Sequence, residues 1–185
     1  MKNIFKNYIL TILFIASPLF ALEGVAVINL QQAVLGTQAA ADAFKALEEE
    51  AEYAANVEQV QTLNADRQAI AEKLQKDRET LSQDEILEME KEFAEKGQDI
   101  QFIAGKIQQA QQEVVQQLFN DLGQSVQRIV GELVAAKQIK LLLEKPVPGQ
   151  QTTSPVLNFD PSLDLTDDVT SMLDVAAAEA PAQSD

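Results

Sequence analysis

Apolar residues recur at steps of three and four between about Thr37 and Ala136, which is the spacing of one helix face. In the first part of this stretch the rhythm is that of a coiled-coil seam. Two seam positions hold the charged residues Arg67 and Asp77, where a tight helix pair would carry apolar side chains. The pattern predicts a helix over residues 37–80. Its seam positions are Phe44, Leu47, Ala51, Ala54, Val57, Leu63, Arg67, Ile70, Leu74, Asp77 and Leu81.

A helix start interrupts this pattern near residue 82. Ser82 and Glu85 have the spacing of a capping box, in which the serine oxygen accepts a hydrogen bond from a free backbone N–H and the glutamate reaches back to the cap. A second helix is therefore predicted over residues 83–136. Its seam positions are Ile86, Met89, Phe93, Gly97, Ile100, Ile103, Ile107, Ala110, Val114, Leu118, Leu122, Val126, Ile129 and Leu133. Because a helix can begin here only if the preceding one has ended, we predict a tight turn near residues 81–84 and an antiparallel hairpin.

The hairpin segment contains no proline between Pro18 and Pro146, and its commonest residues favour helices. At 1.5 Å per residue, the two predicted helices would be about 66 and 81 Å long. Helices of this length exceed those of ordinary globular domains, so the hairpin is expected to project. Four glycines interrupt the second helix, and either close helix approach or local pliability would explain them. They are Gly97, Gly105, Gly123 and Gly131.

Short segments flank the hairpin. Residues 25–30 are a nearly continuous apolar run, typical of a strand buried on both faces. Residues 139–144 and 155–159 predict two further strands, and residues 163–173 predict a short helix with acidic residues at its N-terminal end. The Ala, Pro and Gln content of residues 175–185 predicts a disordered tail.

The predicted fold class is α+β, with a long antiparallel helical hairpin projecting from a small β-body. The expected organisation is a signal peptide at 1–21, the N-terminal strand segment at 22–36, the hairpin at 37–136, C-terminal strands with a short helix at 137–174, and the tail at 175–185.

The first 21 residues have the order of a secretory signal peptide. Lys2 and Lys6 precede an apolar run at 9–16, and Ala21 offers a small residue for cleavage. The apolar run is shorter than the roughly 20 residues of a membrane span. We expect a periplasmic protein cleaved after Ala21, with an uncleaved N-terminal anchor as the alternative.

Composition removes several function classes. The 185 residues include no His and no Cys, which excludes zinc fingers, haem ligation and Cys/His or Ser-His-Asp catalysis. No calcium-binding loop is present, and no cofactor is expected. The net charge of −15 repels phosphate backbones and argues against nucleic acid. Since no two carboxylates are placed in a protected pocket by the pattern, we do not expect an enzyme.

The order of these elements resembles the Skp/OmpH-like periplasmic chaperones. The resemblance covers Gly24 to about Leu173 and depends on a proline-free hairpin, a preceding 25–29 strand and a closing 164–169 helix. Members of this family are homotrimers in which three hairpins surround a cavity that holds unfolded outer-membrane β-barrel proteins without ATP. The resemblance implies a similar fold and a similar holdase role for this chain.

Self-association is also expected from the residues themselves. A helical hairpin with three short strands encloses little core, and a small sheet would leave its edges exposed. Shared strands and packed hairpin bases would cover those edges. The candidate trimer core is Val25, Val27, Leu30, Val126, Ile129, Leu133, Leu141 and Leu143.

Client contacts are expected from scattered apolar residues of the hairpin. Phe102 lies off the seam and is the best candidate for an exposed contact, whereas the others also fit a hairpin core. The candidates are Leu63, Ile70, Leu74, Phe93, Ile100, Phe102 and Ile103. The alternative function is a periplasmic structural or adaptor protein whose hairpin docks a folded partner.

The distal hairpin departs from the basic members of the family. Residues 66–100 contain six basic and eleven acidic residues, a net charge of −5. Anionic membranes would repel such a surface. We therefore do not expect the chain to bind lipopolysaccharide or anionic lipid.

Overall fold

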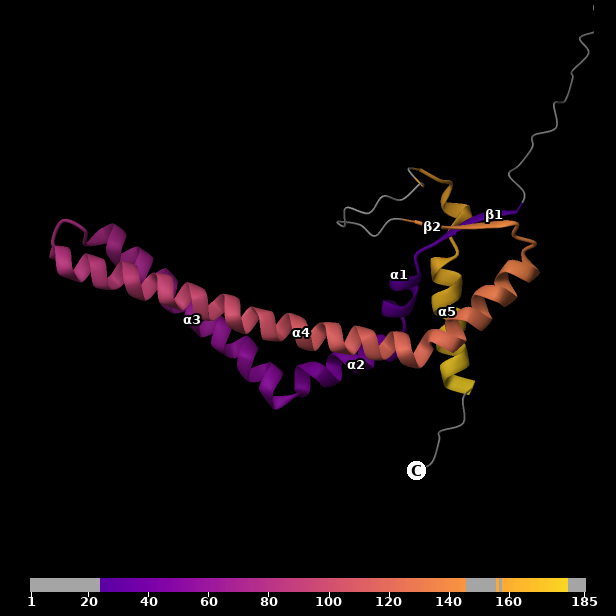
Figure 1. Cartoon of the computed structure of the whole chain (residues 1–185), viewed down its shortest axis with the longest axis horizontal. Coiled ribbons are helices and arrows are strands. Elements are labelled where there is room, and N and C mark those ends of the chain that lie inside the picture. Colours follow the sequence, from indigo (N-terminus) through magenta and orange to yellow (C-terminus); the bar gives the residue numbers. More distant parts are fainter. Residues whose placement is uncertain (1–23, 146–155, 157, 180–185) are drawn as a thin grey trace, which may run out of the picture.

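The computed structural model describes residues 24–145, 156 and 158–179, so the predicted signal peptide lies outside the described residues. Figure 1 shows a long helical hairpin that projects from a small body, which the first and last described elements of the chain form. This arrangement confirms the predicted α+β class. The elements are β1 (Val25–Ile28), α1 (Leu30–Leu35), α2 (Gln38–Glu49), α3 (Ala51–Lys76), α4 (Gln83–Ala136), β2 (Leu141–Glu144), a 3-10 turn (Pro161–Leu163) and α5 (Thr166–Glu179).

Helix α4 runs the whole length of the molecule and begins at the predicted capping box. The Ser82 N–H donates to Glu85 Oε2 at 2.8 Å, and the Glu85 N–H donates to Ser82 Oγ at 3.3 Å. Two otherwise free backbone donors are thereby satisfied, which stabilises this helix end. The hydrogen bonds of Ser82 also lower the pKa of the Glu85 carboxyl.

The first arm of the hairpin is two helices, so the prediction of one helix over residues 37–80 is wrong. Glu50 adopts extended backbone angles (φ −65°, ψ 129°) between α2 and α3. A continuous helix would stack Glu48 against Glu52 at i,i+4 spacing, where like charges repel. The break instead places Glu52 in the first turn of α3, where the helix dipole favours an acid. Figure 1 shows the resulting bend, which points away from α4.

The turn of the hairpin begins earlier than predicted. Asp77 is the C-cap of α3, and its carbonyl oxygen accepts hydrogen bonds from the N–H groups of Thr80 and Leu81. Asp77 is therefore part of the turn rather than of the helical seam. Its place in the turn explains why a seam position of the sequence pattern holds a charged residue rather than an apolar one.

The N-terminal strand is shorter than predicted, because the chain turns into α1 after Ile28. Asn29 caps α1 by accepting a hydrogen bond from the Gln32 N–H at 2.8 Å, so Leu30 is the first helical residue rather than part of the strand. The buried strand residues Ala26, Val27 and Ile28 are 2–3% exposed, as expected for a strand covered on both faces.

The sheet contains β1 and β2, which pair in parallel with Val25 opposite Leu141 and Ile28 opposite Glu144. On the other side of β1, Val27 forms a bridge with Asp164. The predicted strand at 155–159 is wrong for the described residues 156, 158 and 159, which are irregular, and residues 155 and 157 lie outside the described residues.

Helix α5 extends beyond the predicted short helix and includes residues 175–179 of the predicted tail, while residues 180–185 lie outside the described residues. This correction has two physical causes. The added residues are mainly alanines, which have the highest helix propensity. The helix also packs through Val169 and Leu173, which are 0% and 1% exposed.

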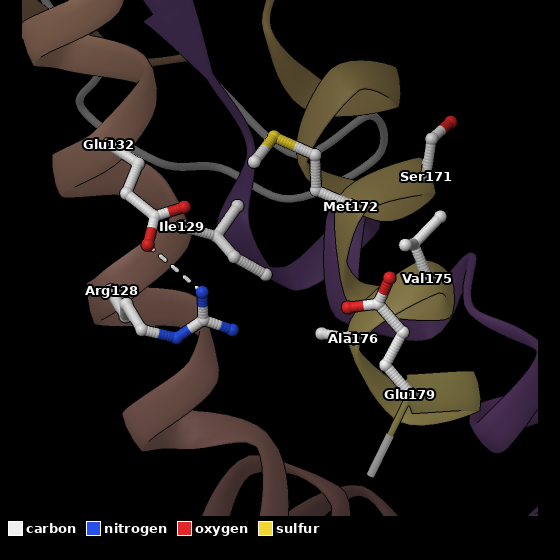
Figure 2. Close-up of a pocket in the computed structure, with 8 residues that line it drawn as sticks. All are labelled: Arg128, Ile129, Glu132, Ser171, Met172, Val175, Ala176 and Glu179. Atoms are coloured by element: carbon white, nitrogen blue, oxygen red, sulfur yellow. Dashed lines mark hydrogen bonds and ion pairs between the residues drawn. The ribbon is translucent and has the colours of Figure 1, made fainter.

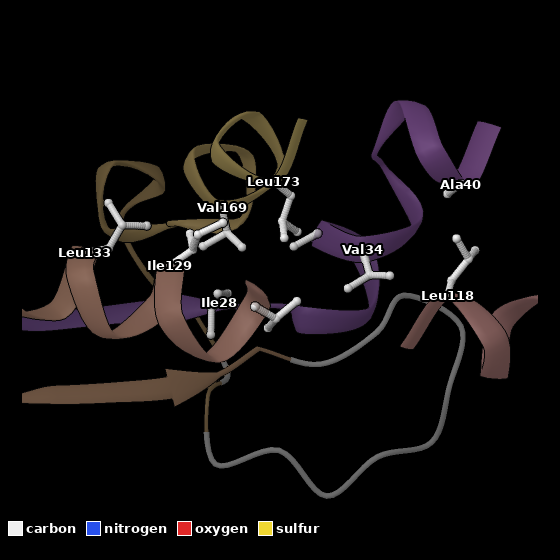
Figure 3. Packing of buried hydrophobic residues seen from close by; sticks show 10 residues of the cluster. Ile28, Val34, Ala40, Leu118, Ile129, Leu133, Val169 and Leu173 are labelled. Carbon is white, nitrogen blue, oxygen red and sulfur yellow. The ribbon is translucent and has the colours of Figure 1, made fainter. Parts of the chain in front are cut away.

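The main core lies where the base of α4 meets α1, α2 and α5 (Figure 3). It contains ten buried apolar residues from β1 and these four helices. They are Ile28, Ala33, Val34, Ala40, Leu118, Val126, Ile129, Leu133, Val169 and Leu173. Since the distal part of the hairpin makes no contribution to this cluster, α3 and α4 there rely on one another.

Candidate functional site

The distal hairpin carries a polar layer at the predicted seam. The Arg67 guanidinium lies over the Phe93 ring, with Cζ 4.1 Å from the ring centroid, and Arg67 Nε donates to the Phe93 carbonyl oxygen at 3.2 Å. A Cβ placed on Gly97 would lie 3.5 Å from the same guanidinium, in ordinary contact. A seam position with a charged residue is therefore filled by stacking rather than left open.

An ion pair extends this layer across the hairpin. Lys96 Nζ of α4 lies 2.8 Å from Asp66 Oδ2 of α3 and 3.5 Å from Glu92 Oε1. The hydrogen bond that Lys96 donates to Asp66 is the main cause that raises the pKa of Lys96. Together with the contact between Arg67 and Phe93, this ion pair aligns α3 against α4.

The seven candidate client-contact residues differ in exposure. Ile70 and Ile103 are buried between α3 and α4, at 9% and 5% exposed. Four more are half-buried: Leu63, Leu74, Phe93 and Ile100. Phe102 is 68% exposed, as its off-seam position predicted. A client chain could reach Phe102 without disturbing the pairing of the two helices.

Phe102 has a charged neighbour, and Leu87 is a second exposed apolar residue that the sequence analysis does not include among the candidates. Lys106 Nζ lies 5.2 Å from the centroid of the Phe102 ring. Leu87, near the hairpin turn, is 55% exposed. Leu87 lies off the α4 seam, and this position, like that of Phe102, could have predicted its exposure from the sequence.

The eight candidate trimer-core residues fall into two groups. Four are buried within the single chain, and they are Val27, Val126, Ile129 and Leu133. The other four are accessible: Leu141 is 50% exposed, and Val25, Leu30 and Leu143 are half-buried. Only the accessible group has surface left for another copy. Val175 of α5, 55% exposed, is an accessible apolar residue that the sequence did not indicate.

A hollow of about 310 Å³ lies between α4 and α5 beside Val175 (Figure 2). Ile129, Met172 and Ala176 contribute apolar walls. Arg128 Nη1 lies at its edge and is paired with Glu132 Oε1 at 2.9 Å. The hollow is open, so it resembles a surface for an apolar side chain of another molecule more than an enclosed ligand site.

A buried polar cluster joins the two strands to α5. The Asn29 N–H donates to Thr166 Oγ1 at 3.0 Å, and the Asp164 carboxylate accepts from Thr166 and from Lys145 Nζ. Burial acts to raise the pKa of Asp164, but the hydrogen bonds from Lys145 and Thr166 outweigh it and lower the pKa. Among the described residues, Asn29 Nδ2 finds no hydrogen-bond partner, although Asn29 is only 1% exposed.

Three of the four glycines of α4 do not mark close helix packing. An ideal Cβ on Gly105, Gly123 or Gly131 would meet no atom of the described residues within 4 Å. Only Gly97 faces a neighbouring side chain, that of Arg67. The first of the two explanations given by the sequence is therefore not supported for three of the four positions.

The described residues contain neither a metal-binding cluster nor a membrane-spanning helix. No three acidic side chains come together there to hold a metal ion. Among the helices described, none combines the length and apolar character needed to cross a membrane.

Comparison with known proteins places these observations in a family. Residues 24–173 match the model of the family Outer membrane protein (OmpH-like). Among solved structures, an OmpH-like protein from Caulobacter crescentus CB15 is 19% identical, with a TM-score of 0.42, and the match covers 84% of this chain and 86% of that one. No curated protein matches the chain. Because the family match extends over most of the sequence, the chain belongs to the OmpH-like family.

Proposed function

We propose that this protein is an ATP-independent holdase of the periplasm that shields unfolded outer-membrane β-barrel proteins. Membership of the OmpH-like family supports the proposal. The observation that carries it is the exposure of Phe102 and Leu87 on a projecting hairpin. The proposed role needs no catalysis and no cofactor.

Scattered apolar contacts suit a holdase better than one deep pocket. A single exposed side chain contributes at most about 1.5–3 kcal/mol when it is fully buried by a partner. Several such contacts on separate hairpins retain an unfolded chain through their combined effect, while each can be released. The client is thereby held without being fixed in one conformation.

We further propose a homotrimer, with the client held between three hairpins. The accessible surface of Leu141, Leu143 and Val175 at the body supports this assembly, because exposed apolar groups there would be covered by other copies. The acidic hairpin would repel anionic lipid, so lipopolysaccharide and anionic membranes are not proposed partners.

The experiment that tests the holdase dilutes a urea-unfolded outer-membrane β-barrel protein into buffer with the mature protein and follows light scattering. We expect aggregation to be suppressed at one trimer per client. Undiminished aggregation at this ratio would exclude the function. The mass of the mature protein, measured by multi-angle light scattering, should be about three times that of one chain, and a monomer would contradict the trimer.

The alternative is an adaptor that docks a folded partner. An adaptor would be recovered by crosslinking with one stable folded protein and would leave the aggregation of unfolded barrels unchanged. The same two measurements therefore separate the two functions.

A further inference from the structure

A hollow lined by amide side chains lies at the base of the hairpin, between α4 and the α1–α2 segment. Its volume is about 560 Å³. Phe44 of α2 and Val115 of α4 give it apolar walls, and Gln31 of α1 lies on the wall opposite α4. The remaining lining residues are Gln108, Gln111, Gln112 and Gln116 of α4. We call this hollow the glutamine groove.

Three glutamines of the groove have amide groups available for a ligand. Gln108, Gln112 and Gln116 follow one another at four-residue spacing, so they form a row on one face of α4. Among the described residues, none of the three forms a hydrogen bond, and all three are exposed.

The neighbouring glutamines of α4 are engaged. Gln109 Nε2 donates to Glu113 at 2.9 Å, and Gln117 Nε2 donates to Asp121 at 2.9 Å, both within the helix. Gln111, at the edge of the groove, donates to Tyr53 Oη at 2.9 Å. The row inside the groove therefore differs from otherwise similar glutamines a few residues away.

The groove is also a neutral region in an acidic protein. The whole chain has a net charge of −15, yet none of the residues that line the groove is charged. In α4, residues 107–118 contain one charged residue, Glu113, which does not line the groove. A ligand with no net charge would therefore meet no electrostatic repulsion there and would not have to remove water from a charged side chain.

The spacing of the row matches the backbone of an extended chain. Residues four apart in a helix are separated by about 6 Å along its axis. In an extended chain, alternate residues present an N–H and a C=O along the same edge about every 6.6–6.8 Å. Each glutamine offers both a donor and an acceptor, which is what one such N–H and C=O require. Three side chains can absorb the small mismatch because they are long and flexible.

We propose that the glutamine groove binds the backbone of an extended segment of an unfolded polypeptide, through amide–amide hydrogen bonds from Gln108, Gln112 and Gln116. Phe44 and Val115 then contact the alternate side chains of that segment. Because the groove reads the backbone, its binding depends little on the client's sequence or charge. This inference deepens the proposed holdase function and rests on it.

The test compares two peptides with wild-type protein and variants by fluorescence anisotropy. The first is a labelled strand segment of an outer-membrane β-barrel protein, and the second has the same sequence with its central backbone amides N-methylated. Wild-type protein should bind the methylated peptide about tenfold more weakly, since each lost hydrogen bond contributes modestly. The double variant Gln108→Ala/Gln112→Ala should lose about tenfold for the unmodified peptide and should bind both peptides about equally.

The matched control is Gln109→Ala/Gln117→Ala, which removes two glutamines of the same helix that lie outside the groove. This variant should retain wild-type affinity and the preference for the unmodified peptide, and circular dichroism should show both variants folded. Wild-type affinity in Gln108→Ala/Gln112→Ala, or an equal loss in the control, would overturn the groove assignment. If the protein still prevents aggregation in that case, the holdase function stands without it. If wild-type protein neither binds the peptide nor prevents aggregation, both proposals are overturned.

Discussion

The Arg67 guanidinium stacks on the Phe93 ring, with Cζ 4.1 Å from its centroid, while Nε donates to the carbonyl oxygen of the same residue at 3.2 Å. This double contact lets a charged side chain occupy the seam of a two-helix arm. The positive charge faces the negative face of the ring, and the N–H satisfies a backbone acceptor. The same contact requires α3 and α4 to be in one alignment, so it also specifies their register.

Replacing Arg67 by alanine should weaken the hairpin. We expect Arg67→Ala to lower the free energy of unfolding by about 1–2 kcal/mol, because the cation–π contact and a part-buried hydrogen bond are both lost. Urea denaturation followed by circular dichroism measures this change. Arg78→Ala, in the exposed turn, is the control and should change stability by less than about 0.5 kcal/mol. Equal losses in the two variants would show that the stacking is not stabilising.

Local signals explain which elements the sequence predicts correctly. Ser82 and Glu85 are three residues apart, so the start of α4 depends only on neighbours and is found at the predicted residue. The exposure of Phe102 likewise follows from its place off the apolar seam. The family resemblance is confirmed because it depends on the order of such elements.

Contacts between distant residues explain what the sequence does not predict. Helix α1 has six residues, and the N–H of its N-cap Asn29 donates to Thr166, 137 positions away. The C-terminal extension of α5 is anchored in part by Asp174, which accepts from the Gln38 N–H at 2.8 Å. No window of sequence contains both partners of these contacts.

Replacing exposed glycines of α4 by alanine should stabilise the protein. Gly105→Ala and Gly131→Ala should each raise the free energy of unfolding by up to about 1 kcal/mol, since alanine lowers the entropy of the unfolded chain and a Cβ meets open space. Urea denaturation of the single variants measures the gain. A loss of stability at either position would contradict the open surroundings of that glycine.

Gly24→Ala is the matched opposite case. Gly24 has a φ of +90°, and a Cβ there would lie 3.0 Å from the Gln138 carbonyl oxygen. The variant should therefore lose at least about 1 kcal/mol, through backbone strain and a clash. If Gly24→Ala lowers the free energy of unfolding and Gly105→Ala raises it in the same assay, the loss at Gly24 reflects conformational strain rather than a general effect of replacing glycine.

The polar cluster at Asp164 predicts loss of stability in acid. The folded pKa of Asp164 lies below its ordinary value of 3.8, so its contribution is present above that value and is lost as the pH falls through the lower folded pKa. Asp164→Asn should be about 1–3 kcal/mol less stable near neutral pH, because Lys145 loses its partner. As the pH falls from about 5 to about 2.5, the free energy of unfolding of Asp164→Asn should decrease less than that of wild type.

Urea denaturation across this pH range checks the prediction, with Asp99→Asn as control. Asp99 is an exposed carboxylate of α4 that has no hydrogen bond or ion pair among the described residues. Its variant should follow the wild-type pH dependence. If Asp164→Asn also follows it, the cluster does not contribute to acid sensitivity.

Phe102 and Ile103 are neighbours with opposite surroundings, and they separate client binding from hairpin stability. Phe102 is 68% exposed and Ile103 is 5% exposed. Phe102→Ala should change the free energy of unfolding by less than about 0.5 kcal/mol, since the side chain packs on little else. Ile103→Ala should lower it by about 2–4 kcal/mol, because a buried side chain is lost between α3 and α4.

The two variants should also differ in the aggregation assay. Under conditions in which both are folded, Phe102→Ala should require about two- to threefold more protein to suppress aggregation of an unfolded β-barrel, since one contact of about 0.5 kcal/mol or more per hairpin is removed. Ile103→Ala should suppress aggregation as well as wild type does, because its side chain is not accessible to a client. A holding defect confined to Ile103→Ala would contradict the exposed contact and would place client recognition in the packing of the hairpin itself.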